Sequence, residues 1–182
     1  MPRRVRVMGT SGAGKTRVAR RLAASLGVPH IELDALHHRA GWQQAPDPEF
    51  QDEVRQAAAT SSGWVADGNY ESRLGAVLAN ADTYVWLDYP RRVVIWRLVR
   101  RTLVRVILRR ELWNGNREEW RGLFSRDPRE NILLWAWTTH ATKRRRYEAA
   151  SNAPSGAIWV RLESPKQAEK WLRAIEQGSR GS

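Results

Sequence analysis

The stretch from Val5 to Thr16 carries the residue types and spacing that bind phosphate groups. It reads as a short apolar run, then Gly-x-x-x-x-Gly-Lys-Thr, then the start of a helical pattern. The glycines allow backbone N–H groups to approach phosphate oxygens, and the start of the helix adds partial positive charge. In such a loop we expect Lys15 to reach the β- and γ-phosphates of a nucleotide and the Thr16 hydroxyl to ligate Mg²⁺. The predicted phosphate cradle consists of Gly9, Thr10, Ser11, Gly12, Ala13, Gly14, Lys15 and Thr16.

Three carboxylates come at the ends of later predicted strands. If the strand that ends in Asp67 neighbours the first strand, Asp67 should hold Mg²⁺ or a metal-bound water, although a helix-capping or turn role stays open. Asp34 ends a strand in the crevice where open α/β sheets bind ligands, and with His37 it could hold or activate an acceptor hydroxyl. Asp88 is better explained as a helix N-cap.

Hydrophobic patterning places this chemistry on a β-α-β framework. A strand, the loop and a helix are followed by a second strand, which predicts a parallel sheet with crossover helices. The predicted strands are 5–9, 28–34, 64–67, 83–88 and 157–162, and the predicted helices are 14–26, 49–60, 71–79, 91–110, 129–149 and 165–177. We therefore expect an α/β fold of three layers, with about five parallel strands flanked by helices, in one domain over residues 1–177. Residues 35–60 would form the acceptor-binding region, and 178–182 a disordered tail.

Arginine recurs at every fourth position along the predicted helix 91–110. The arginines on one face are Arg97, Arg101, Arg105 and Arg109, and the apolar stripe expected to be buried is Ile95, Val99, Leu103 and Val106. The arginine row could pack against protein carboxylates or point toward bound phosphates, and the second role is favoured at its C-terminal end. The cationic, glycine-containing segment 109–128 suits a lid that closes over phosphates.

The chain of 182 residues has a net charge of +12 and no cysteine. This charge favours anionic partners, whether nucleotides, nucleic acid or anionic lipid, although general arginine-rich usage explains it as well. Disulfides and thiolate metal sites are excluded within these residues, and an intracellular location is permitted. No stretch approaches the roughly 20 apolar residues of a membrane span, and no signal peptide is recognised. We therefore expect a cytoplasmic protein without a membrane partner.

Tryptophan is unusually frequent, with ten residues. Those expected to lie in the core are Trp86, Trp96, Trp135, Trp137, Trp159 and Trp171. Trp42 and Trp113 lie in irregular, polar stretches, where they could stack on a base or ring of a ligand or simply pack against loops.

Several motifs together resemble the adenylate-kinase-like P-loop kinases, and they are most similar to the group called topology modulation proteins. The motifs are the loop 9–16, Ile31-Glu32-Leu33-Asp34, Asp67-Gly68-Asn69-Tyr70 with Arg73, Leu87-Asp88-Tyr89-Pro90 and the arginine-rich insertion. The resemblance implies ATP with Mg²⁺ as the phosphoryl donor, and adenine near Ser164-Pro165. It also implies lid arginines on the transferred phosphoryl group, with Arg117 and Arg121 first and Arg110 next.

The same resemblance leaves two classes of acceptor open. Nucleoside monophosphate kinases carry Asp-Gly-Phe-Pro-Arg, whose arginine binds the acceptor phosphate; here Asn69-Tyr70 replace the middle pair and Arg73 is displaced by two positions. The run from Asp34 to His37 is similar to the Asp-x-x-His of gluconate kinases, and shikimate kinases use an aspartate here for the acceptor hydroxyl. Together with Trp42 from the irregular stretch, the predicted acceptor-binding residues are Asp34, His37, Trp42, Tyr70 and Arg73.

Motifs and resemblance together predict a kinase that transfers the γ-phosphoryl group of ATP, with Mg²⁺, to a nucleotide or a hydroxyl metabolite. The predicted catalytic residues are Lys15, Asp34, Arg117 and Arg121. Two other functions stay open: a nucleic-acid-associated ATPase or polynucleotide kinase, which the positive charge favours, and a nucleotide-binding regulator without turnover. The expected partner is a small-molecule acceptor, and the chain could act as a monomer or a homodimer.

Overall fold

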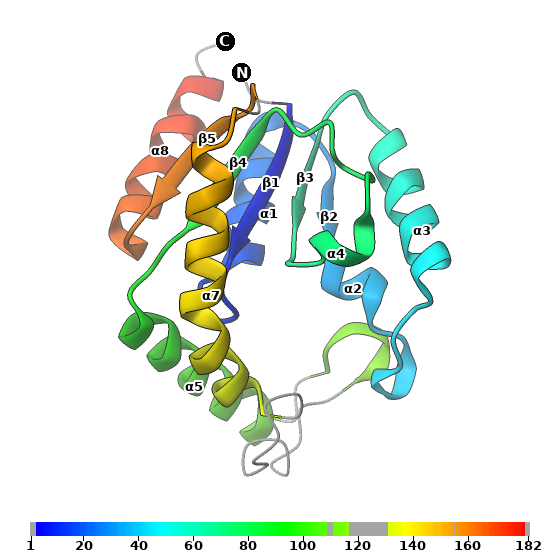
Figure 1. Cartoon of the computed structure of the whole chain (residues 1–182), viewed down its shortest axis with the longest axis vertical. Coiled ribbons are helices and arrows are strands. Elements are labelled where there is room, and N and C mark those ends of the chain that lie inside the picture. The colour runs from blue at the N-terminus through cyan, green and yellow to red at the C-terminus, as the bar shows by residue number, and fades with distance from the viewer. Residues whose placement is uncertain (1–2, 109–110, 117–130, 155, 181–182) are drawn as a thin grey trace.

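Five parallel strands form the central sheet in the order β2-β3-β1-β4-β5 (Figure 1). The strands are β1 (Arg4–Gly9), β2 (His30–Glu32), β3 (Trp64–Asp67), β4 (Thr83–Leu87) and β5 (Ile158–Leu162). The structure is a computed structural model, and it describes residues 3–108, 111–116, 131–154 and 156–180. The strand order puts β1 at the centre of the sheet, so the loop that follows it opens at the middle of the carboxyl edge.

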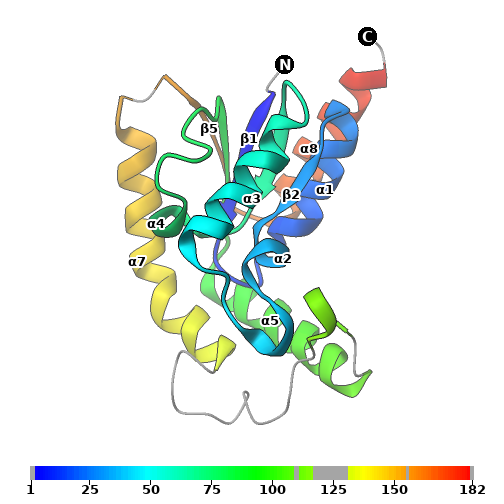
Figure 2. The ribbon, with the colours of Figure 1, turned by 90° about the vertical axis from the view of Figure 1, so that its right-hand side faces the viewer.

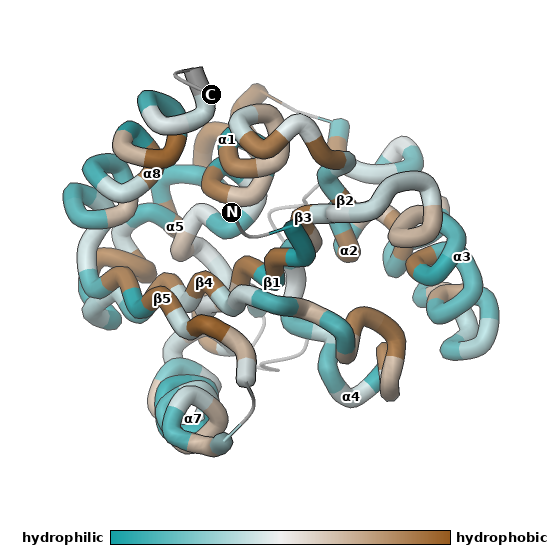
Figure 3. The backbone as a smooth tube through the Cα atoms, turned by 90° about the horizontal axis from the view of Figure 1, so that it is seen from above, coloured by the Kyte–Doolittle hydropathy of each residue, from teal (hydrophilic) through white to brown (hydrophobic). Residues whose placement is uncertain are grey.

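Helices cover both faces of the sheet and its carboxyl edge. They are α1 (Lys15–Leu26), α2 (Leu33–His37), α3 (Asp47–Ala59), α4 (Glu71–Leu74), α5 (Arg91–Ile107), α7 (Ile132–Asn152) and α8 (Pro165–Arg180), with short 3-10 turns η1 (Ala40–Trp42) and η2 (Trp113–Gly115). Figures 2 and 3 show α1 and α8 on one side of the sheet and α4 and α7 on the other. These layers confirm the predicted α/β class with five parallel strands. No helix in the described part of the chain is long and apolar enough to cross a membrane.

The core follows from a sheet that is covered on both faces. Val5 and Val7 of β1 are fully buried, and they belong to a cluster with Leu22 of α1 and Leu172 of α8. A second cluster lies at the β2–β3 end of the sheet and contains Phe50, Val54, Trp64 and Leu74. Parallel strands between helices bury both of their faces, which explains why all four residues of β3 are buried and three of them are apolar.

Two predicted boundaries differ from the structure, and the first of them matters for the site. The second strand ends at Glu32, and Asp34 lies in the first turn of α2 rather than at the end of a strand. At the C-terminus, α8 continues to Arg180, beyond its predicted end at residue 177.

The buried side of α5 also differs from the prediction. Its buried residues are Val94, Leu98, Thr102 and Val106, so of the predicted stripe only Val106 is fully buried. The phase of the helix is set by the phosphate loop, since a Cβ atom at Gly12 would lie 2.8 Å from the Val94 carbonyl oxygen and 3.0 Å from the Leu98 Cβ. Three tryptophans predicted to be core are exposed, at 67% for Trp96, 39% for Trp135 and 52% for Trp137.

Candidate active site

The loop between β1 and α1 has a backbone that requires its glycines. Gly12 and Gly14 have φ values of 87° and 93°, in the left-handed region that residues other than glycine rarely adopt. A Cβ atom at Gly12 would collide with the α5 backbone. The loop is closed by a hydrogen bond from the Ala13 N–H to the Thr10 carbonyl at 3.0 Å. Its conformation therefore depends on glycine at these two positions and on the helix packed below it.

The predicted metal ligands Thr16 and Asp67 lie together beside this loop. Parallel pairing of β1 with β3 sets Val7 opposite Asp67, as the metal hypothesis required. The Thr16 hydroxyl donates to Asp67 Oδ2 at 2.7 Å, and His30 Nε2 lies 2.7 Å from Asp67 Oδ1. Asp67 is only 1% exposed. A hydroxyl next to a carboxylate at the mouth of a phosphate loop is the donor set that fits Mg²⁺, which takes few protein oxygens and completes its shell with water and phosphate.

Two lysines provide positive charge at this point. Burial lowers the pKa of Lys15, whereas the nearby carboxylates of Asp34 and Asp67 raise it. Burial also lowers the pKa of Lys143 on α7 to about 8, and the positive charge of Lys15 adds to that effect. The charge of the loop lysine thus acts on Lys143. The sequence interpretation missed it, because the run 143–146 looks like a solvated helix face.

On the acceptor side, Asp34 is held by Tyr70. The Tyr70 hydroxyl donates to Asp34 Oδ1 at 2.6 Å, across 36 positions of sequence. Burial raises the pKa of Tyr70, and the charge of Asp34 raises it further, so the phenol stays a hydrogen-bond donor. His37 packs against Tyr70 with ring centroids 4.5 Å apart. These three predicted acceptor residues are therefore brought together.

Arg73 completes this cluster, but its guanidinium is occupied by the protein itself. It donates to the Ala45 carbonyl at 2.6 Å and to Asp47 Oδ1 at 2.5 Å. A third donor lies 2.6 Å from His37 Nδ1. Because arginine can only donate, this nitrogen of His37 must be the acceptor. Burial lowers the pKa of His37 to about 4, in agreement with a neutral ring.

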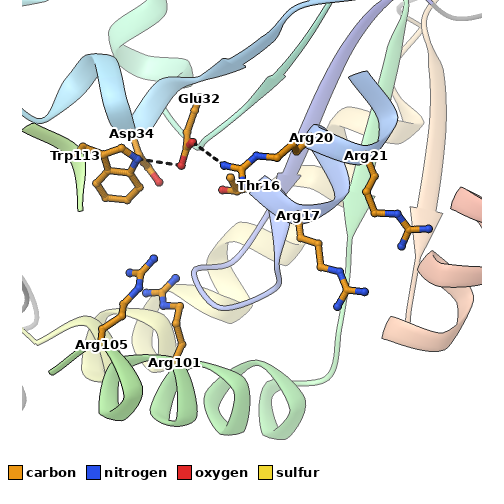
Figure 4. A pocket seen from close by; sticks show the side chains of 9 residues that line it. All are labelled: Thr16, Arg17, Arg20, Arg21, Glu32, Asp34, Arg101, Arg105 and Trp113. Carbon is orange, nitrogen blue, oxygen red and sulfur yellow. Dashed lines mark hydrogen bonds and ion pairs between the residues drawn. The ribbon is translucent and has the colours of Figure 1, made fainter. Parts of the chain in front are cut away.

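A cavity of about 380 Å³ joins the phosphate loop to the acceptor side (Figure 4). It is lined by Thr16, Arg17, Arg20, Arg21, Glu32, Asp34, Arg101, Arg105 and Trp113. Arg101 and Arg105 point from α5 toward Asp34 and Trp113 (Figure 4). This agrees with the role favoured for the C-terminal end of the arginine row. One wall is fixed by Glu32, which accepts from the Trp113 indole N–H at 3.0 Å and from Arg20 at 3.5 Å.

A second, smaller hollow lies on the other side of the phosphate loop. Its lining includes Gly14, Tyr89, Arg97 and Pro165. Arg97 crosses the loop, where it donates to the Ala13 carbonyl at 3.3 Å. This hollow thus contains Pro165, the residue that the resemblance places near adenine.

The turn after Asp67 is tied to the phosphate loop by buried polar contacts. Asn69 donates to the Gly9 carbonyl at 2.8 Å and accepts from the Tyr147 hydroxyl at 3.2 Å. Arg6, which is 5% exposed on β1, donates to the Gly68 carbonyl at 3.4 Å. Sequence reasoning noted the Asp-Gly-Asn-Tyr motif but missed Arg6, because an arginine inside an apolar strand carries no signal of its own.

Other predicted residues lie apart from these contacts or outside the described residues. Trp42 is 41% exposed, and its ring packs near His38 instead of lining the cavity. Asp88 is not a helix cap, because the N-cap of α5 is Pro90 and no side chain caps that helix; Asp88 pairs instead with Arg161 at 2.6 Å and with Arg144 at 3.2 Å. The predicted lid arginines Arg110, Arg117 and Arg121 lie outside the described residues, as does most of the segment 109–128.

Known proteins match this chain over nearly its whole length in structure, but over only a quarter of its length in sequence. No model of a known protein family matches the chain. A segment of 46 residues, 25% of this chain, is 39% identical to a cytidylate kinase from Nitratidesulfovibrio vulgaris, and the match spans 20% of that kinase. A solved shikimate kinase from Bacteroides thetaiotaomicron has a TM-score of 0.54 at 15% identity, over 99% of both chains. A gluconokinase from Sinorhizobium meliloti 1021 has a TM-score of 0.50 at 18% identity, over 97% of this chain and 95% of that one.

These superpositions extend over nearly the whole chain at low identity, so they establish its fold. The chain has the same α/β fold as that shikimate kinase and that gluconokinase. Over one short segment it is also similar to a cytidylate kinase in sequence. The resemblance inferred from the motifs is thereby confirmed at the level of the fold.

Proposed function

We propose that the protein transfers the γ-phosphoryl group of ATP to a hydroxyl group of a small anionic metabolite. One observation carries the proposal: Thr16 of the phosphate loop and Asp34 of the acceptor side line the same cavity of about 380 Å³. A donor phosphate on the loop and an acceptor hydroxyl at Asp34 would then share one space. The kinase names of the structures with this fold agree with the proposal.

On the donor side, the loop N–H groups and Lys15 would bind the β- and γ-phosphates. Thr16 and Asp67 would hold Mg²⁺, which neutralises charge on the phosphates when bound. The hollow beside Gly14, between Arg97 and Pro165, would take adenine, because the guanidinium of Arg97 can stack on a flat ring.

On the acceptor side, Asp34 would accept the proton of the attacking hydroxyl. The hydroxyl oxygen forms a bond to the γ-phosphorus, the bond from that phosphorus to the bridging oxygen breaks, and ADP leaves. Tyr70 orients Asp34 through its hydrogen bond at 2.6 Å. Arg101 and Arg105 would stabilise the negative charge of the transferred group and of the acceptor.

Arg73 favours a hydroxyl metabolite over a nucleotide as the acceptor. In the nucleoside monophosphate kinases that the motifs resemble, an arginine near this position binds the acceptor phosphate. Here Arg73 is bound to Asp47, Ala45 and His37. A nucleotide would have to break these contacts to use it. The arginines of the cavity still favour an acceptor with its own negative charge, such as a hydroxy acid.

The test is a coupled assay of ADP release with three acceptor panels: hydroxy acids, uncharged polyols and nucleoside monophosphates. We expect turnover with members of the first panel, and loss of that turnover in Asp34→Asn with ATP affinity unchanged. Turnover with nucleoside monophosphates instead would overturn the proposed acceptor class. Binding of ATP without turnover in any panel would favour the regulator.

A further inference from the structure

One side of α5 carries exposed apolar side chains for which the kinase site has no use. Exposed fractions are 67% for Trp96, 39% for Leu103 and 65% for Ile107. At 3.6 residues per turn, Trp96 and Ile107 lie about 20° apart around the helix. Val104, at 39% exposed, lies about 80° from Trp96 and borders the same side. We call Trp96, Leu103, Val104 and Ile107, with the exposed Arg92 and Arg100 between and beside them, the outer α5 face.

The opposite side of α5 is buried in the interior of the protein. The exposed apolar residues are therefore not core residues that a rotation of the helix has turned outward. Val94 and Leu98 are 1% and 0% exposed, and both contact the phosphate loop at Gly12. The helix therefore buries one apolar side and exposes a second. Large exposed apolar patches mark places where a protein meets another surface.

The charges of the outer α5 face restrict which kind of partner can bind to it. The helix contains six arginines and no acidic residue. Within the described part of the chain, neither Arg92 nor Arg100 has a carboxylate partner. Two copies joined through this face would bring arginines together, and each chain already carries a net charge of +12. An anionic partner fits the face better than a second copy.

We propose that the outer α5 face docks on an anionic lipid surface. Aliphatic and indole side chains that insert between lipid headgroups, with arginines at their edges, are what an interfacial helix requires. Nucleic acid would satisfy the arginines but leave Leu103 and Ile107 without a partner. Docking on a surface needs no spanning helix, and the proposal differs in this from the expectation of no membrane partner. The inference does not depend on the proposed kinase activity.

Docking through this face leaves the candidate site accessible. Arg101 and Arg105 lie on the side of α5 that faces the cavity, with Asp34 and Thr16 opposite them. The outer face points elsewhere around the same helix. A protein held on the lipid through Trp96 and Ile107 would therefore present the cavity beside the membrane rather than beneath it.

The test is sedimentation of the full chain with vesicles of phosphatidylcholine alone and of phosphatidylcholine mixed with phosphatidylglycerol. We expect binding only to the mixed vesicles, and weaker binding as salt rises. Ile107→Ser should lower the partition coefficient by roughly tenfold, and Arg100→Gln by about fivefold. The matched control is Ile158→Ser on β5, since Ile158 is 64% exposed against 65% for Ile107 and lies on another part of the surface. This control should bind like the wild type.

Three results would overturn the proposal. Equal losses in Ile107→Ser and Ile158→Ser would show that no particular face is used. Self-association without vesicles that Ile107→Ser abolishes would identify a second copy as the occupant. Binding to DNA in place of vesicles, with Ile107→Ser still at the wild-type level, would identify nucleic acid and exclude apolar insertion. All variants change exposed side chains, and their thermal transitions should match that of the wild type.

Discussion

The nucleotide side and the acceptor side of the candidate site are built in different ways. The nucleotide side is a run of eight consecutive residues whose backbone does the work, with glycines at 12 and 14 in left-handed conformations. The acceptor side is a network of side chains from α2, the segment before α3 and the turn at α4, and its central contact joins Asp34 to Tyr70. A backbone site tolerates many side-chain changes around it, whereas a network depends on each of its members.

The largest expected effect comes from breaking the nucleotide side alone. Lys15→Ala should lower kcat by on the order of 10³-fold, because no other loop side chain neutralises the β- and γ-phosphates in the same way. The free energy of unfolding should change little, since burial already disfavours the charged form of Lys15. Steady-state kinetics with a thermal melt measure both. The control is Lys170→Ala on the exposed side of α8, which should leave kcat unchanged.

The contrast between the two sides explains what the sequence could predict. Gly-x-x-x-x-Gly-Lys-Thr after a strand is a local signal, and it leads directly to the loop, to α1 and to a parallel sheet. The placement of Asp67 beside Thr16 followed from one further assumption, that β3 pairs with β1. Both were therefore within reach of the sequence.

Contacts distant in sequence account for most of what the sequence did not predict. The partners of Arg73 on Ala45, Asp47 and His37 depend on how the segment before α3 folds back, and no periodicity reports that. The buried side of α5 was misassigned because this helix has apolar residues around most of its circumference. Its phase is set by contact with Gly12, which only the tertiary structure shows.

A pH titration tests whether the acceptor network holds His37 neutral. Its pKa of about 4 lies below the ordinary value of 6.5, because of burial first and then the positive charges of His38 and Arg73. Between these pH values the unfolded chain takes up a proton that the folded chain does not. This histidine should therefore lower the free energy of unfolding by about 3 kcal/mol as the pH falls from 6.5 to 4.

His37→Gln isolates this contribution, because glutamine can still accept from Arg73 but does not titrate. Chemical denaturation of both proteins at several pH values gives the difference between their stability curves. That difference should vary with pH across the acid window and be constant above it. A constant difference at every pH would mean that His37 is protonated in the folded state as readily as in the unfolded chain.

Asp67 lies at the border between the two sides, and its effect should appear in the metal dependence. Asp67→Asn should raise the Mg²⁺ concentration for half-maximal activity by roughly tenfold, because it removes the negative charge beside the Thr16 hydroxyl. Asp88→Asn is the matched control, since Asp88 is also a buried carboxylate but pairs with Arg161. It should lose stability and keep the wild-type Mg²⁺ titration. The same shift in both variants would argue against a metal role for Asp67.

The smallest effect should come from loosening a single member of the acceptor network. Tyr70→Phe removes the hydroxyl that donates to Asp34 at 2.6 Å and keeps the ring that packs on His37. We expect kcat to fall by roughly fivefold with the KM for ATP unchanged, because Asp34 is less well oriented while the phosphate loop is intact. Tyr84→Phe, whose ring stacks on Trp159 away from the cavity, should retain wild-type kinetics. A rise in the KM for ATP in Tyr70→Phe would mean that the acceptor side and the nucleotide side are coupled. The coupling would pass through the turn from Asp67 to Tyr70, where Asn69 donates a hydrogen bond to the Gly9 carbonyl of the phosphate loop.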